Sequence, residues 1–177
     1  MLGLRSTCSG KHRDAVLEHR GGRDAYTKRS ARGLGDEGNV DHVMECQVLR
    51  YAAEDVLSGR VHEGVGRRFA AAVNDVSNLN LTSRRVNQSK KGPFTAALNR
   101  LGKGATSVDL EALARGGRAS WLVDEGAWSN IEHEIVESYD ALERRLEEER
   151  ATRAHTKALA KATEAVRETL DKMGLMS

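Results

Sequence analysis

Residues with hydrolytic chemistry gather in the middle of the chain, where Asp41 and His42 are neighbours and two asparagines, Asn78 and Asn87, follow. A neutral imidazole accepts a proton near pH 7, and Asp and Asn oxygens suit hard cations such as Mg²⁺. Hydrolysis of a phosphodiester needs an activated water, a cation on the phosphate and little else. These residue types therefore suit phosphodiester chemistry, provided that the fold brings them together.

Two segments around these residues carry a longer pattern, VDHVMECQ over residues 40–47 and NLNLTSRRVNQSKKG over residues 78–92. Asp-His on a first strand, Asn-Leu opening a second strand, and Asn on the next helix near Lys-Gly resemble the HNH, or ββα-metal, endonuclease superfamily. The stretch over residues 40–47 also looks like HNH-type domains of bacterial polymorphic toxins, and Asn87 would make the site an HNN-type variant. The resemblance covers about residues 40–92.

The resemblance implies a role for each matching position. His42 would be the general base that deprotonates a water, and Asp41 and Asn87 would be the two metal ligands. Asn78 would hold the loop behind His42 through hydrogen bonds from its side chain to the backbone. The implied cofactor is a divalent metal, Mg²⁺ or else Mn²⁺. Asn87 replaces the histidine common in the family, and a long helical insertion replaces the usual short loop between the strands.

Other residues near the motif have two interpretations each. Glu45 follows Asp41 by one helical turn, so it either supports the catalytic site or is an exposed carboxylate favoured by the helix dipole. Four basic residues follow the second strand, and they either neutralise phosphates or form a solvated face. These four are Arg84, Arg85, Lys90 and Lys91.

Hydrophobic periodicity and glycine punctuation predict the elements that position these residues. We expect a strand ending at His42 that runs into a helix to residue 57, and a short strand over residues 77–82. Expected helices span 13–19, 67–73, 84–91 and 94–101, another runs from Thr106 or Ser107 to Gly116, and a capping box at Ser129 and Glu132 opens a long C-terminal helix. Residues 151–173 either continue that helix or fold back on it.

The predicted fold is α+β and mostly helical, with a small ββα-metal core, helical insertions and a long C-terminal helical arm. We divide the chain into an irregular segment 1–39 packing on the core, a nuclease core 40–126, and the arm 127–177. Residues 1–120 carry 20 basic and 13 acidic residues, a net charge of +7, whereas the remainder carries 8 and 13, a net charge of −5. A basic body favours a polyanionic partner.

Composition narrows the class of protein. No apolar run approaches the roughly 20 residues that span a bilayer, and the first ten residues lack the apolar stretch of a secretory signal. Two cysteines, Cys8 and Cys46, cannot build a disulfide framework or a thiolate zinc site. We expect an intracellular endonuclease acting on nucleic acid, DNA rather than RNA, with no membrane partner. The alternatives are a catalytically inactive nucleic-acid-binding module, or a helical interaction protein whose C-terminal helix docks a partner or a second copy.

Overall fold

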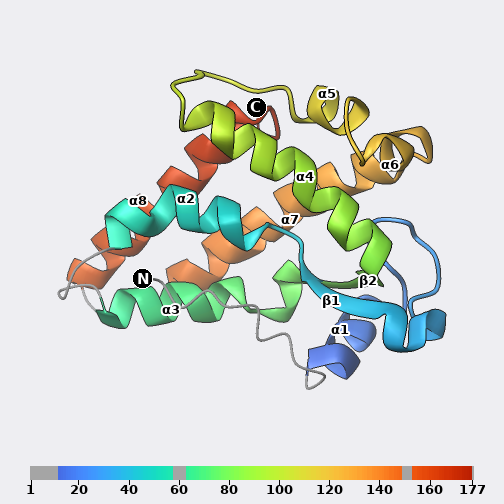
Figure 1. Cartoon of the computed structure of the whole chain (residues 1–177). Coiled ribbons are helices and arrows are strands. Elements are labelled where there is room, and N and C mark those ends of the chain that lie inside the picture. Colours follow the sequence, from blue (N-terminus) through green and yellow to red (C-terminus); the bar gives the residue numbers. More distant parts are fainter. Residues whose placement is uncertain (1–11, 58–62, 149–152, 177) are drawn as a thin grey trace.

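The structure is a computed structural model that describes residues 12–57, 63–148 and 153–176. This part of the chain is mostly helical, with one two-stranded antiparallel sheet (Figure 1), which confirms the expected α+β class. The elements in chain order are α1 (Arg13–His19), η2 (Arg32–Glu37), β1 (Gly38–His42), α2 (Cys46–Leu57), α3 (Glu63–Val73), η4 (Val76–Asn78), β2 (Leu79–Ser83), α4 (Arg84–Leu101), α5 (Leu110–Arg115), α6 (Ser120–Asp124), α7 (Ala127–Glu148) and α8 (Arg153–Lys172).

The strands β1 and β2 pair although α2 and α3 lie between them in sequence. Gly38 pairs with Ser83 at one end of the ribbon, and His42 pairs with Leu79 at the other. Side chains alternate between the two faces of a strand, so Asp41 and His42 point to opposite faces. One face therefore carries Asp41 beside Asn80, and the other carries His42 beside Leu79.

Helix α4 begins directly after β2, and the N-terminal half of α4 covers the strand pair β1–β2 (Figure 1). The side chain of Ser83 caps it by accepting a hydrogen bond from the backbone of Val86. We expected a break at Gly92, but the helix continues to Leu101 through Pro93. Proline removes one backbone hydrogen bond, and this cost is offset because the buried side chains Val86, Pro93, Phe94, Ala97 and Leu101 form one continuous apolar face.

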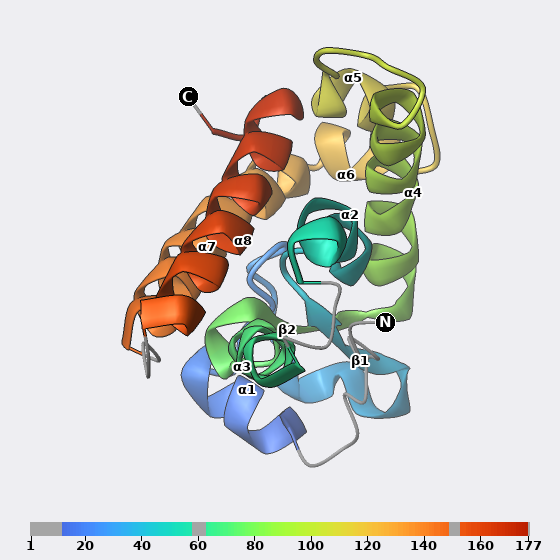
Figure 2. The same cartoon turned by 90° about the vertical axis from the view of Figure 1, so that its left-hand side faces the viewer.

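The main hydrophobic core lies among the helices. Helix α2 passes between α4 on one side and the α7–α8 pair on the other (Figure 2), and its Val48, Leu49 and Ala53 are buried. Helix α8 folds back along α7 and packs on α2, which is one of the two arrangements expected for residues 151–173, and both helices pack into the core. Their apolar stripe is buried in the chain's own core, because Ile131, Ile135, Leu142 and Val166 belong to the same cluster as the α2 residues.

Three helix starts differ from the expected ones. Helix α3 begins at Glu63, before Gly64 and Gly66, because the buried residues Val65 and Phe69 already share one helical face. Helix α5 begins at Leu110, later than the expected start at Thr106 or Ser107. The Asp109 side chain caps it there by accepting a hydrogen bond from the Ala112 backbone at 2.8 Å.

The capping box predicted at Ser129 does not form. Helix α7 begins earlier, at Ala127, because Ala127 and Trp128 are buried in the core. The Glu132 carboxylate accepts from the Trp128 indole at 2.7 Å, and the Ser129 hydroxyl donates to the Gly126 carbonyl. Among the described helices, none is both long enough and apolar enough to cross a membrane.

Candidate functional site

A buried lysine lies at the junction of β1 and α4. The Nζ atom of Lys90 is 2.6 Å from Asp41 Oδ2 and 3.2 Å from Glu45 Oε1, and it donates to the Tyr26 hydroxyl at 3.0 Å. It also donates to the backbone carbonyls of His42 at 2.6 Å and Val43 at 3.1 Å. The lysine therefore fastens α4 to the end of β1 and to the turn that follows it.

Electrostatics keep this lysine charged. Burial lowers the pKa of Lys90, but the charge of Asp41, together with that of Glu45, outweighs burial and raises that pKa well above its ordinary value. Burial raises the pKa of Glu45, an effect that Lys90 opposes. Burial also raises the pKa of Tyr26, so its hydroxyl stays protonated, and it lies 3.1 Å from Asp41 Oδ2. The site thus contains a permanent positive charge that compensates the buried carboxylates.

Asn78 holds the turn after β1, the contact expected of it. Its Oδ1 accepts from the Met44 backbone at 2.8 Å, and its Nδ2 donates to the Val73 carbonyl at 2.9 Å. The Asn78 carbonyl accepts from the Val43 backbone at 2.8 Å as well. Because Asn78 is buried, these bonds fix the backbone on the C-terminal side of His42.

His42 is the last residue of β1 and lies against the segment that follows α3. Its Nε2 is 2.8 Å from Asn74 Oδ1, and 5% of the residue is exposed. Burial lowers the pKa of His42, Lys90 and Lys91 lower it further, and Asn74 and Asp41 oppose the change. A lowered pKa favours the neutral imidazole, which is the form that accepts a proton.

The proposed metal ligands lie on two neighbouring elements, Asp41 on β1 and Asn87 on α4. Asn87 lies one helical turn before Lys90 on α4, and its Oδ1 is buried and accepts no hydrogen bond from the described residues. Among the described residues, the contacts of the Asp41 carboxylate with Lys90 and Tyr26 are both made by Oδ2. Asn87 thus offers an unpaired oxygen of the kind that a hard cation prefers, whereas Lys90 already neutralises the Asp41 carboxylate and would compete with a metal for it. No group of three or more His, Cys, Asp and Glu side chains suited to a metal occurs in the described part of the chain.

The four basic residues of α4 do not act alike. Lys90 is completely buried, so the expectation that it contacts nucleic acid is wrong: its charge is taken up by Asp41 and Glu45. Lys91 is exposed and lies near enough to His42 and Glu45 to lower the pKa of each.

Arg84 and Arg85 follow Ser83, at the end of the β1–β2 strand pair opposite to His42. With Arg118 they line a groove of about 630 Å³, which Asp36 and Glu37 also border. The Arg85 guanidinium stacks on the Trp121 ring, 4.1 Å from its centroid, and this stacking restrains the arginine. The groove is therefore a second candidate surface for a polyanion, separate from the His42 end.

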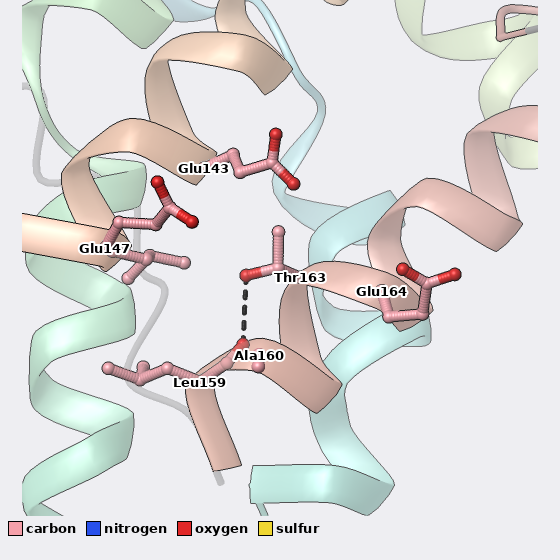
Figure 3. Close-up of a pocket in the computed structure, with 7 residues that line it drawn as sticks. Glu143, Glu147, Leu159, Ala160, Thr163 and Glu164 are labelled. Atoms are coloured by element: carbon pink, nitrogen blue, oxygen red, sulfur yellow. Dashed lines mark hydrogen bonds between the residues drawn. The ribbon is translucent and has the colours of Figure 1, made fainter. Parts of the chain in front are cut away.

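A smaller hollow of about 170 Å³ lies between α7 and α8. Figure 3 shows Glu143 and Glu147 of α7 and Glu164 of α8 around it. The Thr163 hydroxyl in this hollow donates to the Leu159 carbonyl of its own helix at 2.9 Å. The acidic rim repels nucleic acid, so this hollow is no part of the candidate site.

Tyr26 and Asn74 are two residues of the site that the sequence did not predict. Tyr26 comes from a glycine-rich stretch without periodicity, in a loop tied to β2 through Asp24, whose carboxylate accepts from Asn80 and Thr82, each at 2.8 Å. Asn74 follows α3 and matches no part of the HNH pattern. Neither residue has a local signal, because each reaches the site through tertiary contacts alone.

Comparison of the chain with protein-family models, with curated proteins and with solved structures found no match. The likeness to HNH endonucleases is therefore a hypothesis that depends on the residues of positions 40–92 and on their geometry.

Proposed function

We propose that this protein is a metal-dependent endonuclease that hydrolyses phosphodiester bonds of nucleic acid, with DNA as the preferred substrate. The observation that carries the proposal is the antiparallel strand pair β1–β2, whose second strand leads directly into α4. Along it, Asp41 and His42 end one strand, Asn78 holds the turn behind His42, and Asn87 follows on the helix.

His42 acts as the general base in this proposal. Its neutral imidazole, favoured by the lowered pKa, removes a proton from the attacking water, and the water oxygen attacks phosphorus in line with the leaving oxygen. Lys91 is exposed beside His42 and supplies positive charge for the scissile phosphate. Lys90 keeps Asp41 and the backbone of His42 in place.

Asp41 and Asn87 would hold the cation, through the oxygens that accept no hydrogen bond within the described ranges. A bound Mg²⁺ or Mn²⁺ would stabilise negative charge on the phosphate and on the leaving oxygen. The chain's own contribution would be to place Asp41 on β1 and Asn87 on α4, where the metal would share the Asp41 carboxylate with Lys90.

The proposal is tested by incubating the purified chain with plasmid DNA and with RNA, in Mg²⁺, in Mn²⁺ or in EDTA. We expect cleavage of DNA that EDTA abolishes. His42→Ala should lose about 10²- to 10⁴-fold in rate, the usual contribution of a general base. His133→Ala is the matched control, because that histidine is exposed on α7 and its ion pair is with Glu137 of the same helix.

Two results would overturn the proposal. One is the absence of cleavage by the parent protein with either metal; binding of DNA without cleavage would then favour an inactive binding module. The other is equal loss of rate in the His42 and His133 variants, since both would then act through something other than the candidate site.

A further inference from the structure

The side chain of Asn74 has only one orientation that satisfies its neighbours. Its Nδ2 lies 2.8 Å from the Ala70 carbonyl oxygen, and its Oδ1 lies 2.8 Å from His42 Nε2. A carbonyl oxygen only accepts hydrogen bonds, so the NH₂ group must face Ala70. The reversed amide would set two oxygens against each other, and its orientation is thereby fixed.

This orientation decides which nitrogen of His42 carries the proton. Asn74 Oδ1 is an acceptor, so Nε2 must be protonated to donate to it. In the neutral ring the lone pair is then on Nδ1. No hydrogen bond joins Nδ1 to the described residues, so Nδ1 is the ring nitrogen left to accept a proton.

We infer that Asn74 is a positioning residue that holds His42 as the Nε2–H tautomer and leaves Nδ1 as the atom that accepts the proton. The catalytic meaning of this inference rests on the proposed nuclease function, whereas the tautomer itself does not. Asn74 is suited to the task because α3 anchors it: its backbone N–H and its side chain both donate to the Ala70 carbonyl. The acceptor presented to the histidine is therefore held from both ends of the residue.

The first measurement is the tautomer itself, by NMR of the ¹⁵N-labelled imidazoles in the full chain at alkaline pH, where His42 is neutral. The His42 signals are assigned by their loss in His42→Ala. We expect the pattern of an Nε2–H imidazole in the parent protein. An Nδ1–H pattern would overturn the inference, whatever the protein does to nucleic acid.

The second measurement uses two substitutions of Asn74. Asn74→Leu keeps a similar shape but has no acceptor, so we expect mixed tautomers and a fall in kcat of about 10- to 100-fold, as for other residues that orient a ligand or base, with KM nearly unchanged. Asn74→Asp keeps an acceptor opposite Nε2 but loses the donor to the Ala70 carbonyl, so we expect the Nε2–H tautomer in a less firmly held side chain and a kcat between those of the Leu variant and the parent. Asn99→Leu, at an exposed position on α4, is the control for substituting an asparagine.

The outcomes separate the two claims. Equal kcat in the Leu variant and in the parent would overturn the positioning role, and so would an unchanged tautomer in that variant. If the Leu variant does not fold, the parent tautomer and the Asp variant still decide the matter. A parent protein with the Nε2–H tautomer that cuts no nucleic acid would refute the proposed function while leaving the structural assignment intact.

Discussion

Replacing Lys90 by methionine is the most informative perturbation of the fold around the site. Methionine keeps much of the apolar stem, but it leaves the carboxylates of Asp41 and Glu45 buried without their cation, which lies 2.6 and 3.2 Å away in the parent. Removing one partner of a buried ion pair typically costs about 3–5 kcal/mol. Because whole domains are stable by about 5–15 kcal/mol, the variant should be folded but markedly weaker.

Urea denaturation and thermal melts of Lys90→Met at pH 7 measure this cost. For a chain of this size, 1 kcal/mol shifts Tm by roughly 2–4 °C, so we expect a decrease of about 6–20 °C. Lys91→Met is the matched control, since the adjacent lysine is exposed and should change stability by about 0.5 kcal/mol or less. A loss below about 1 kcal/mol in Lys90→Met would refute the reasoning.

The pH dependence gives an independent check on the cause. Burial already raises the pKa of Glu45, and losing Lys90 raises it further. A raised carboxyl pKa favours folding below the unfolded value of 4.5, and this contribution is lost as pH rises through the folded pKa. The deficit of the variant should thus be largest near pH 7 and shrink as the pH falls toward 4.5. A deficit independent of pH would mean that packing of the lysine stem, and not its charge, stabilises the site.

Three further outcomes test the remaining assignments. Arg84→Ala should weaken DNA binding alike for all sequences and lower the salt slope by about 1, while Lys161→Ala on α8 should leave the slope unchanged, as filter-binding titrations in salt will measure. Asn87→Ala should raise the Mg²⁺ concentration needed for half-maximal cleavage with little loss of thermal stability, because its Oδ1 makes no hydrogen bond in the described part of the chain; an unchanged metal requirement would argue against this ligand. Asn78→Ala should lower the free energy of unfolding by about 1–3 kcal/mol for each backbone group that it leaves unpaired, and Asn99→Ala by far less, in urea titrations of both variants.

The sequence by itself determined the elements whose signals are local. Alternating residues predicted β2, the cap at Ser83 predicted the start of α4, and Arg13–His19 forms the helix that its short periodic stretch indicated. The pairing of Asp41-His42 with the Asn-Leu strand could also be anticipated, since an edge of unpaired backbone needs a partner and the resemblance supplied one. Helix ends were predicted less well where a buried apolar face continues through a glycine or a proline. At Gly92 and Pro93 a break was expected, but α4 continues to Leu101.

Only the tertiary structure decided which polar residues meet at the site. Lys90 was expected to contact nucleic acid or to lie on a solvated basic face, yet it is buried because Tyr26, 64 residues away, and Asp41 converge on it. Asn74 contacts His42 across 32 residues of sequence, a contact that no spacing rule contains. The hydrophobic periodicity of a helix or strand is a property of residues close together in the sequence. A charge can be buried only where groups from distant parts of the chain compensate it, and these groups meet only in the folded structure.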